Sequence, residues 1–183
     1  MTRVATVVGV AASVLCAANV TAQTRPDFSG RWTSEPERAT PAPRGGGRGG
    51  GAARAGDMGS GWGPTITVAQ EASRLTVEYL FFARGDMQPP LKFVYALDGS
   101  ESKNSVMMGR GIQVQTSKTT WDGDKLIITT VHTFENPADS QPMKIEVKQT
   151  LALESPTALI VETTRSSVLG GPPSTTRTAY RKN

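Results

Sequence analysis

Apolar and polar residues alternate with a period of two along most of the chain from residue 64 to its end, and this alternation restricts the fold more than any other feature. The clearest stretch is 143–153, where apolar residues alternate with Lys144, Glu146 and Lys148. Successive side chains of a β-strand point to opposite faces of a sheet, so each such segment has one dry face and one wet face. No window of this region has the apolar spacing of a helix. We therefore predict an all-β domain.

Ten segments are candidate strands. They lie near residues 28–34, 64–70, 74–82, 91–97, 101–107, 112–121, 125–134, 142–154, 158–166 and 174–182. The turns Asp98-Gly99 and Asp122-Gly123-Asp124 favour tight hairpins between neighbouring strands. A meander closes most economically as a barrel, because closure removes unpaired edges. We predict an antiparallel up-and-down β-barrel of about eight to ten strands, with a two-sheet β-sandwich as the alternative.

Residues 1–22 have the pattern of a secretory signal peptide. Arg3 precedes an apolar stretch at residues 4–18, and Ala22 precedes the expected cleavage point. A membrane anchor is the alternative, but a spanning helix needs about 20 apolar residues. Cys16 is the only cysteine and lies in this segment, so the mature chain would have no disulfide, which suits bacterial export. We expect a periplasmic or extracellular bacterial protein whose residues 23–183 form one domain.

Residues 36–63 interrupt the alternation with a Gly/Arg-rich stretch, and we predict a disordered loop there. Such a loop is tolerated inside a domain because closure entropy grows slowly with length. Arginine and glycine runs also occur in RNA-binding segments. Export and the lack of aromatic residues between Arg44 and Arg54 argue against nucleic acid. A weak contact with an anionic envelope surface is the expected role.

Several motifs resemble a known group of proteins. Phe28-Ser29-Gly30-Arg31-Trp32 resembles the Gly-x-Trp opening strand of lipocalin-like barrels. Further motifs are similar to those of uncharacterised exported bacterial proteins with Gly/Arg-rich insertions: Tyr95-x-Leu97-Asp98-Gly99-x-Glu101, Trp121-Asp122-Gly123-Asp124-Lys125-Leu126 and Tyr180-Arg181-Lys182. The resemblance implies a lipocalin-like barrel in which Trp32 plugs one end. It also implies that Arg181, or less favourably Arg177, packs over Trp32 through a cation–π contact.

Metal and catalytic motifs are weak in this sequence. His132 is the only histidine, and a lone histidine cannot supply the clustered ligands of a zinc site. Asp122 and Asp124 flank a turn glycine, but the remaining ligands of a calcium loop are missing. A histidine base would also need a positioned nucleophile and an orienting carboxylate, which the spacing does not suggest. We predict no catalytic residue, no metal site and no cofactor.

The aromatic residues give the remaining candidate site. Tyr79, Phe93, Tyr95 and Trp121, with His132, either line a ligand cavity in the barrel mouth or fill a dry core. We expect an exported, non-catalytic barrel that binds a small apolar or amphipathic ligand. The alternatives are a barrel enzyme of isomerase or cyclase type and an envelope interaction protein that uses the Arg/Gly-rich loop. Paired ionisable groups at inward positions would favour the enzyme.

Overall fold

The computed structural model describes residues 25–35, 60–79, 90–108, 111–135, 142–166 and 171–183. The predicted signal peptide at 1–22 and residues 36–59 of the predicted loop lie outside this range. None of the described segments is a helix with the length and apolarity needed to cross a bilayer.

Every regular element that the structure describes is a β-strand. The strands are β1 Gly30–Ser34, β2 Thr65–Gln70, β3 Arg74–Tyr79, β4 Leu91–Ala96, β5 Ser102–Met108, β6 Gly111–Asp122, β7 Lys125–Glu135, β8 Pro142–Ser155, β9 Ala158–Arg165 and β10 Ser174–Lys182. They form one ten-stranded antiparallel sheet in the order β4-β3-β2-β1-β10-β9-β8-β7-β6-β5. The predictions of an all-β class and an up-and-down barrel are confirmed, and the two-sheet alternative is wrong because the sheet is continuous.

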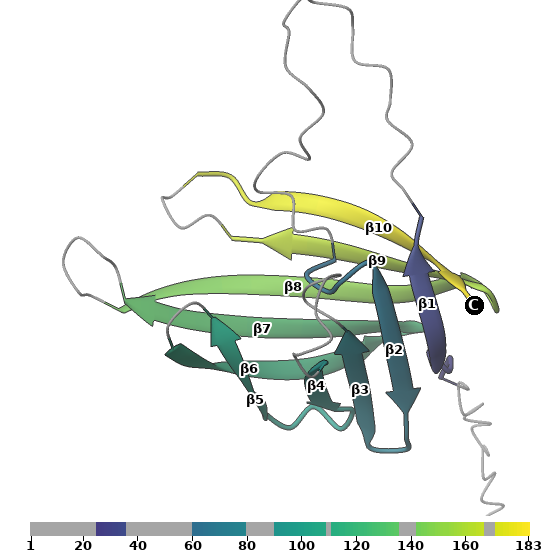
Figure 1. Cartoon of the computed structure of the whole chain (residues 1–183), viewed down its shortest axis with the longest axis horizontal. Helices are drawn as coiled ribbons and strands as arrows, with labels where there is room; N and C mark the ends of the chain where they lie inside the picture. Colours follow the sequence, from purple (N-terminus) through teal and green to yellow (C-terminus); the bar gives the residue numbers. More distant parts are fainter. Residues whose placement is uncertain (1–24, 36–59, 80–89, 109–110, 136–141, 167–170) are drawn as a thin grey trace, which may run out of the picture.

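The barrel has a long side and a short side. Strands β6 to β10 run side by side along the long axis of the molecule, whereas β1, β2 and β3 are shorter and cross them steeply (Figure 1). The long strands extend beyond the short ones. Among the described residues, part of the inner face of the long strands therefore has no strand opposite it.

Two different joins close the barrel. The first and last strands of the chain pair through a backbone ladder, with Trp32 opposite Lys182 and Ser34 opposite Tyr180. The two edge strands, β4 and β5, are joined by side chains instead. Ser102 Oγ accepts a hydrogen bond from the Ala96 amide at 2.7 Å. Asn104 Oδ1 accepts a hydrogen bond from the Val94 amide at 2.8 Å, and Asn104 Nδ2 donates to the Val94 carbonyl at 3.0 Å. The asparagine amide thus takes the place of a peptide group, and we call this join the seam.

The predicted alternation decides which side chains meet inside. In β3 the apolar residues Leu75, Val77 and Tyr79 are buried while their neighbours are not. Each fully buried aliphatic or aromatic side chain stabilises the fold by about 1.5–3 kcal/mol. Gly123 has a positive φ angle of 61°, as the predicted hairpin turn between β6 and β7 requires. Gly99 has a positive φ angle of 85°, but its turn connects β4 and β5, which share no backbone ladder in the described structure, so the hairpin predicted there is wrong.

Candidate functional site

One end of the barrel closes around Trp32. Its side chain is fully buried, and its indole Nε1 donates a hydrogen bond to the Phe28 carbonyl oxygen at 3.0 Å. The Lys182 Nζ atom lies 5.2 Å from the centre of the Trp32 ring, which is a cation–π contact. A Cβ atom at residue 30 would lie 2.5 Å from Lys182 Cε. The glycine of the Gly-x-Trp motif therefore leaves room for the lysine side chain.

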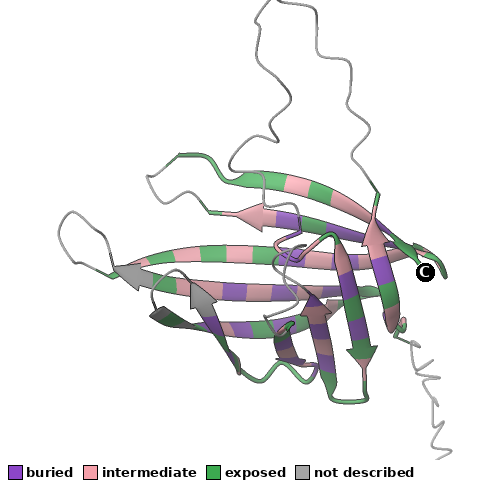
Figure 2. Ribbon diagram, in the orientation of Figure 1, coloured by how far each residue is buried: buried purple, intermediate pink, exposed green. Residues whose placement is uncertain are grey.

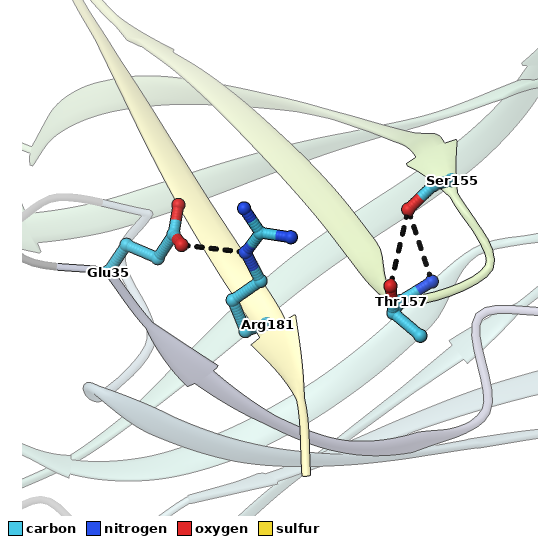
Figure 3. A network of polar contacts seen from close by, with 4 residues as sticks. All are labelled: Glu35, Ser155, Thr157 and Arg181. Atoms are coloured by element: carbon cyan, nitrogen blue, oxygen red, sulfur yellow. Dashed lines mark hydrogen bonds and ion pairs between the residues drawn. The ribbon is translucent and has the colours of Figure 1, made fainter.

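The cation expected over Trp32 is Lys182, and the prediction of Arg181 is corrected. Tyr180 is buried, so the alternation of the strand turns Arg181 outward and Lys182 inward. Arg181 Nε donates to Glu35 Oε1 at 2.6 Å on the outside (Figure 3). Arg177, the other candidate, forms an exposed ion pair with Glu154.

Trp121 belongs to the same closed end. Its ring stacks on Phe28 with centroids 6.1 Å apart, and the guanidinium carbon of Arg25 lies 4.9 Å from its centroid. Phe28 thus joins Trp121 to Trp32. The buried Trp121 Nε1 atom has no hydrogen-bond partner in the described structure.

Tyr79, Phe93 and Tyr95 fill the barrel next to this end. The rings of Tyr79 and Phe93 stack at 5.7 Å, and those of Phe93 and Tyr95 at 6.4 Å. Trp62 packs on Tyr95 at 6.5 Å. All four side chains are buried. Burial raises the pKa of Tyr79 to about 12 and raises the pKa of Tyr95 as well. Three of the predicted ligand-binding residues are therefore core residues.

A short segment of the chain, residues 60–63, lies inside the barrel, and we call it the plug. Its carbonyl groups accept hydrogen bonds from side chains of the barrel wall: Ser60 O from Gln149 Nε2 at 2.5 Å, Gly61 O from Tyr79 Oη at 3.3 Å and Gly63 O from Tyr180 Oη at 3.1 Å. The Ser60 hydroxyl pairs with the Tyr180 hydroxyl at 2.5 Å. Residues 60–63 are the last four residues of the predicted disordered loop, and these hydrogen bonds hold them against the barrel wall.

At the other end, the inward residues of the long strands are only partly buried, and we call this end of the barrel the mouth. Strand β8 alternates between exposed and half-buried residues until Val147, and its first buried residue is Gln149 (Figure 2). Met143, Ile145 and Val147 share the inward face of β8 and are only half-buried. They form an apolar strip that none of the ten described strands covers.

Two basic side chains flank this strip. His132 on β7 is the cross-strand partner of Ile145, and Arg165 on β9 is the cross-strand partner of Val147. Burial first, and then the charge of Arg165, lower the pKa of His132 below its ordinary value of 6.5. The imidazole is therefore neutral at pH 7 while the guanidinium is positive.

A set of buried polar residues lies on the inner faces of β6 to β9, level with Val147 of the apolar strip and next to it, and we call this set the polar band. The band consists of Gln115, Ser117, Thr119, Thr130, Gln149 and Thr163. Ser117 and Thr130 bond each other through their hydroxyl groups at 2.8 Å. The Thr163 Oγ1 atom has no hydrogen-bond partner in the described structure. Burying an unpaired hydroxyl is unfavourable, so this position is suited to a bound partner.

The five residues predicted to bind a ligand therefore lie in three different parts of the barrel. Tyr79, Phe93 and Tyr95 lie in the core, Trp121 lies at the closed end, and only His132 lies at the mouth. The described residues contain no cluster of histidine, cysteine and acidic side chains able to hold a metal ion.

Sequence reasoning missed Gln149, Thr163 and Arg165, which complete the polar end of the interior. A signal for them exists, because each follows apolar residues at the inward positions of its strand, as Thr163 follows Leu159 and Val161. The plug has no comparable signal.

Comparison of the chain with family models, with curated proteins and with solved structures gives no match.

Proposed function

We propose that this protein is an exported bacterial barrel that binds a small amphipathic molecule at its mouth. The observation that carries the proposal is the half-buried apolar strip of Met143, Ile145 and Val147, which lies between His132 and Arg165. An apolar tail would lie along the strip. Ligand sites in proteins commonly combine such an apolar lining with a few oriented polar groups.

The charges at the mouth favour an anionic head group. Arg165 carries a positive charge and is half-buried, so its attraction for an anion is screened less than at an open surface. The lowered pKa of His132 keeps its imidazole neutral and available as a hydrogen-bond partner. A long-chain carboxylate has this combination of an apolar tail and one anionic end.

His132 and Arg165 are two ionisable groups at inward positions, which is the arrangement expected of an enzyme, but binding has more support than catalysis. A general base needs an orienting partner, which is usually a carboxylate. The charged group that influences His132 is the cation Arg165 instead. The aromatic side chains that might have shaped a reaction chamber are occupied with one another and with Trp62.

Fluorescence titration with a dansyl-labelled fatty acid tests the proposal. The full chain should bind the probe saturably, and Ile145→Ser should weaken binding about tenfold because it removes apolar contact. Lys144→Ser, on the outer face of the same strand, is the matched control and should leave the affinity unchanged. Absence of saturable binding, or equal losses in the two variants, would contradict the proposal.

A second variant tests the head group. Arg165→Gln should weaken binding of the acid by about tenfold but leave binding of the corresponding fatty alcohol nearly unchanged, because only the acid carries a charge. Equal weakening of both would remove the proposed role of Arg165 in recognising the anion.

A further inference from the structure

The plug occupies the interior in the manner of a bound peptide. Three of its carbonyl groups are held by side-chain donors of the wall, namely Gln149, Tyr79 and Tyr180. One of its own amides, that of Trp62, bonds back to the Ser60 hydroxyl at 3.2 Å. These four hydrogen bonds join backbone groups to side chains, unlike the backbone ladders that hold the ten strands together.

The plug also lies close to Gln149 of the polar band and to Arg165 at the mouth. A Cβ atom at Gly61 would lie 3.4 Å from both Arg165 Nη2 and Gln149 Nε2, and the φ angle of Gly61 is 82°. Gln149 is the cross-strand partner of Thr163, whose hydroxyl has no partner. The wall donors that hold the plug are therefore neighbours of the groups that a ligand entering the mouth would meet.

We propose that the plug, residues 60–63, is a displaceable internal occupant: it leaves the wall while the barrel stays folded, and the ligand of the mouth competes with it for the inner wall. The first part stands on the plug contacts alone, whereas the competition rests on the proposed function. Release of the plug would free the donors of Gln149, Tyr79 and Tyr180 together, since all three hold one segment. Ligand binding and plug seating then exclude each other.

Two buried serines allow the release to be measured. Ser60 in the plug and Ser117 in the wall are each 1% exposed, and each has its hydroxyl in one buried hydroxyl pair. In a Cys16→Ser background, which removes the only native thiol, the variants Ser60→Cys and Ser117→Cys report by their rates of modification with a thiol reagent. Ser73→Cys, in an exposed turn, gives the rate of an open site.

The thiol at position 60 should react at least about tenfold faster than that at position 117, because local opening needs less free energy than opening the barrel. Gln149→Leu should accelerate the reaction at position 60 about fivefold by removing one wall donor. The matched control is Gln115→Leu, a second buried glutamine, on β6. Equal rates at positions 60 and 117 would overturn the displaceable plug.

Addition of the dansyl-labelled fatty acid tests the competition. Saturating probe should raise the rate at position 60 toward that of position 73 and leave position 117 protected. Probe binding without acceleration at position 60 would overturn the competition and leave the proposed function standing. Failure of the probe to bind would overturn the proposed function and the competition with it, while the rates without probe still decide whether the plug is displaceable.

Discussion

Gly30, Lys182 and Trp32 depend on one another at the closed end of the barrel. The φ angle of Gly30 is 144°, a value that residues with a Cβ atom rarely adopt. Its missing side chain also leaves space for the Lys182 chain on its way to the Trp32 ring. The Gly-x-Trp motif is thus explained by backbone geometry and by a close side-chain approach.

We predict that Gly30→Ala lowers the free energy of unfolding by about 1–3 kcal/mol, because it adds backbone strain and a clash with Lys182. Urea unfolding measures this loss. The double variant Gly30→Ala with Lys182→Ala should remain less stable than Lys182→Ala alone, since the strain persists when the clash is gone. Equal stability of those two chains would show that φ strain contributes nothing.

His132 gives the protein a pH dependence in a defined window. Its pKa is lowered in the folded state, so the unfolded chain takes up the proton more readily. The contribution of the neutral His132 side chain to the free energy of unfolding is complete above pH 6.5. It falls as the pH drops from 6.5 toward the pKa of His132 in the folded state. Hydrogen bonds from Ser29 and Ser100 are the chief causes that lower the pKa values of Asp27 and Asp98. These two carboxyl groups change the stability only near and below pH 3.8, the ordinary pKa of an aspartate.

We therefore expect His132→Gln to flatten the loss of stability between pH 6.5 and pH 5, as followed by urea unfolding at fixed ionic strength. Arg165→Gln should flatten it partly, because the charge of Arg165 is the second cause of the shift. An unchanged pH profile in His132→Gln would assign the acid sensitivity of this range to another group.

Single residues were the least predictable part of the site. Alternation could have shown that Lys182, and not Arg181, shares the inward face with Tyr180, had the burial of Tyr180 been taken as the reference. The position of Trp62 could not be predicted, because it follows a stretch without periodicity and packs on Tyr95 of β4.

At the scale of elements, most hairpins were predictable and the seam was not. Ranges such as 64–70 and 174–182 nearly coincide with β2 and β10, because period-two patterns and Asp-Gly turns are local. The seam depends on two side chains of β5, Ser102 and Asn104, whose roles appear only when β4 and β5 meet. Nothing in the neighbouring sequence distinguishes this asparagine from an ordinary polar strand residue.

Removal of the Asn104 side-chain amide should weaken the contact between β4 and β5. We predict that Asn104→Ala lowers the free energy of unfolding by about 1–3 kcal/mol, because it leaves the Val94 amide and carbonyl without their partner. Hydrogen exchange at the Val94 amide should accelerate in parallel. Ser105→Ala, at the exposed neighbouring position, is the control and should change neither quantity. Exchange at Val94 as slow as in the unaltered chain would contradict this role of Asn104.

The whole molecule combines a filled half and an open half. The class of fold follows from the alternation, since apolar faces of so many strands must meet in one interior. Whether that interior is hollow does not follow, because barrels of similar strand number can be filled or empty. Here the difference in strand length decides it: the short strands cover the aromatic core, and the long ones extend past them to form the mouth (Figure 1).

The ladder between β1 and β10 sets a limit on how fast the chain can fold. It joins residues at opposite ends of the sequence, such as Trp32 and Lys182. The remaining ladders join consecutive strands. A circular permutant that links residue 183 to residue 25 and begins at Ser100 would run from β5 through β10 and β1 to β4. Every backbone ladder would then join consecutive strands, and only the seam between β4 and β5, which has no backbone ladder, would join the two ends of the permuted chain. Because folding rates rise as contacts become more local, its refolding in stopped-flow experiments should be faster than that of the natural order, and an unchanged rate would show that this late pairing is not the slow step.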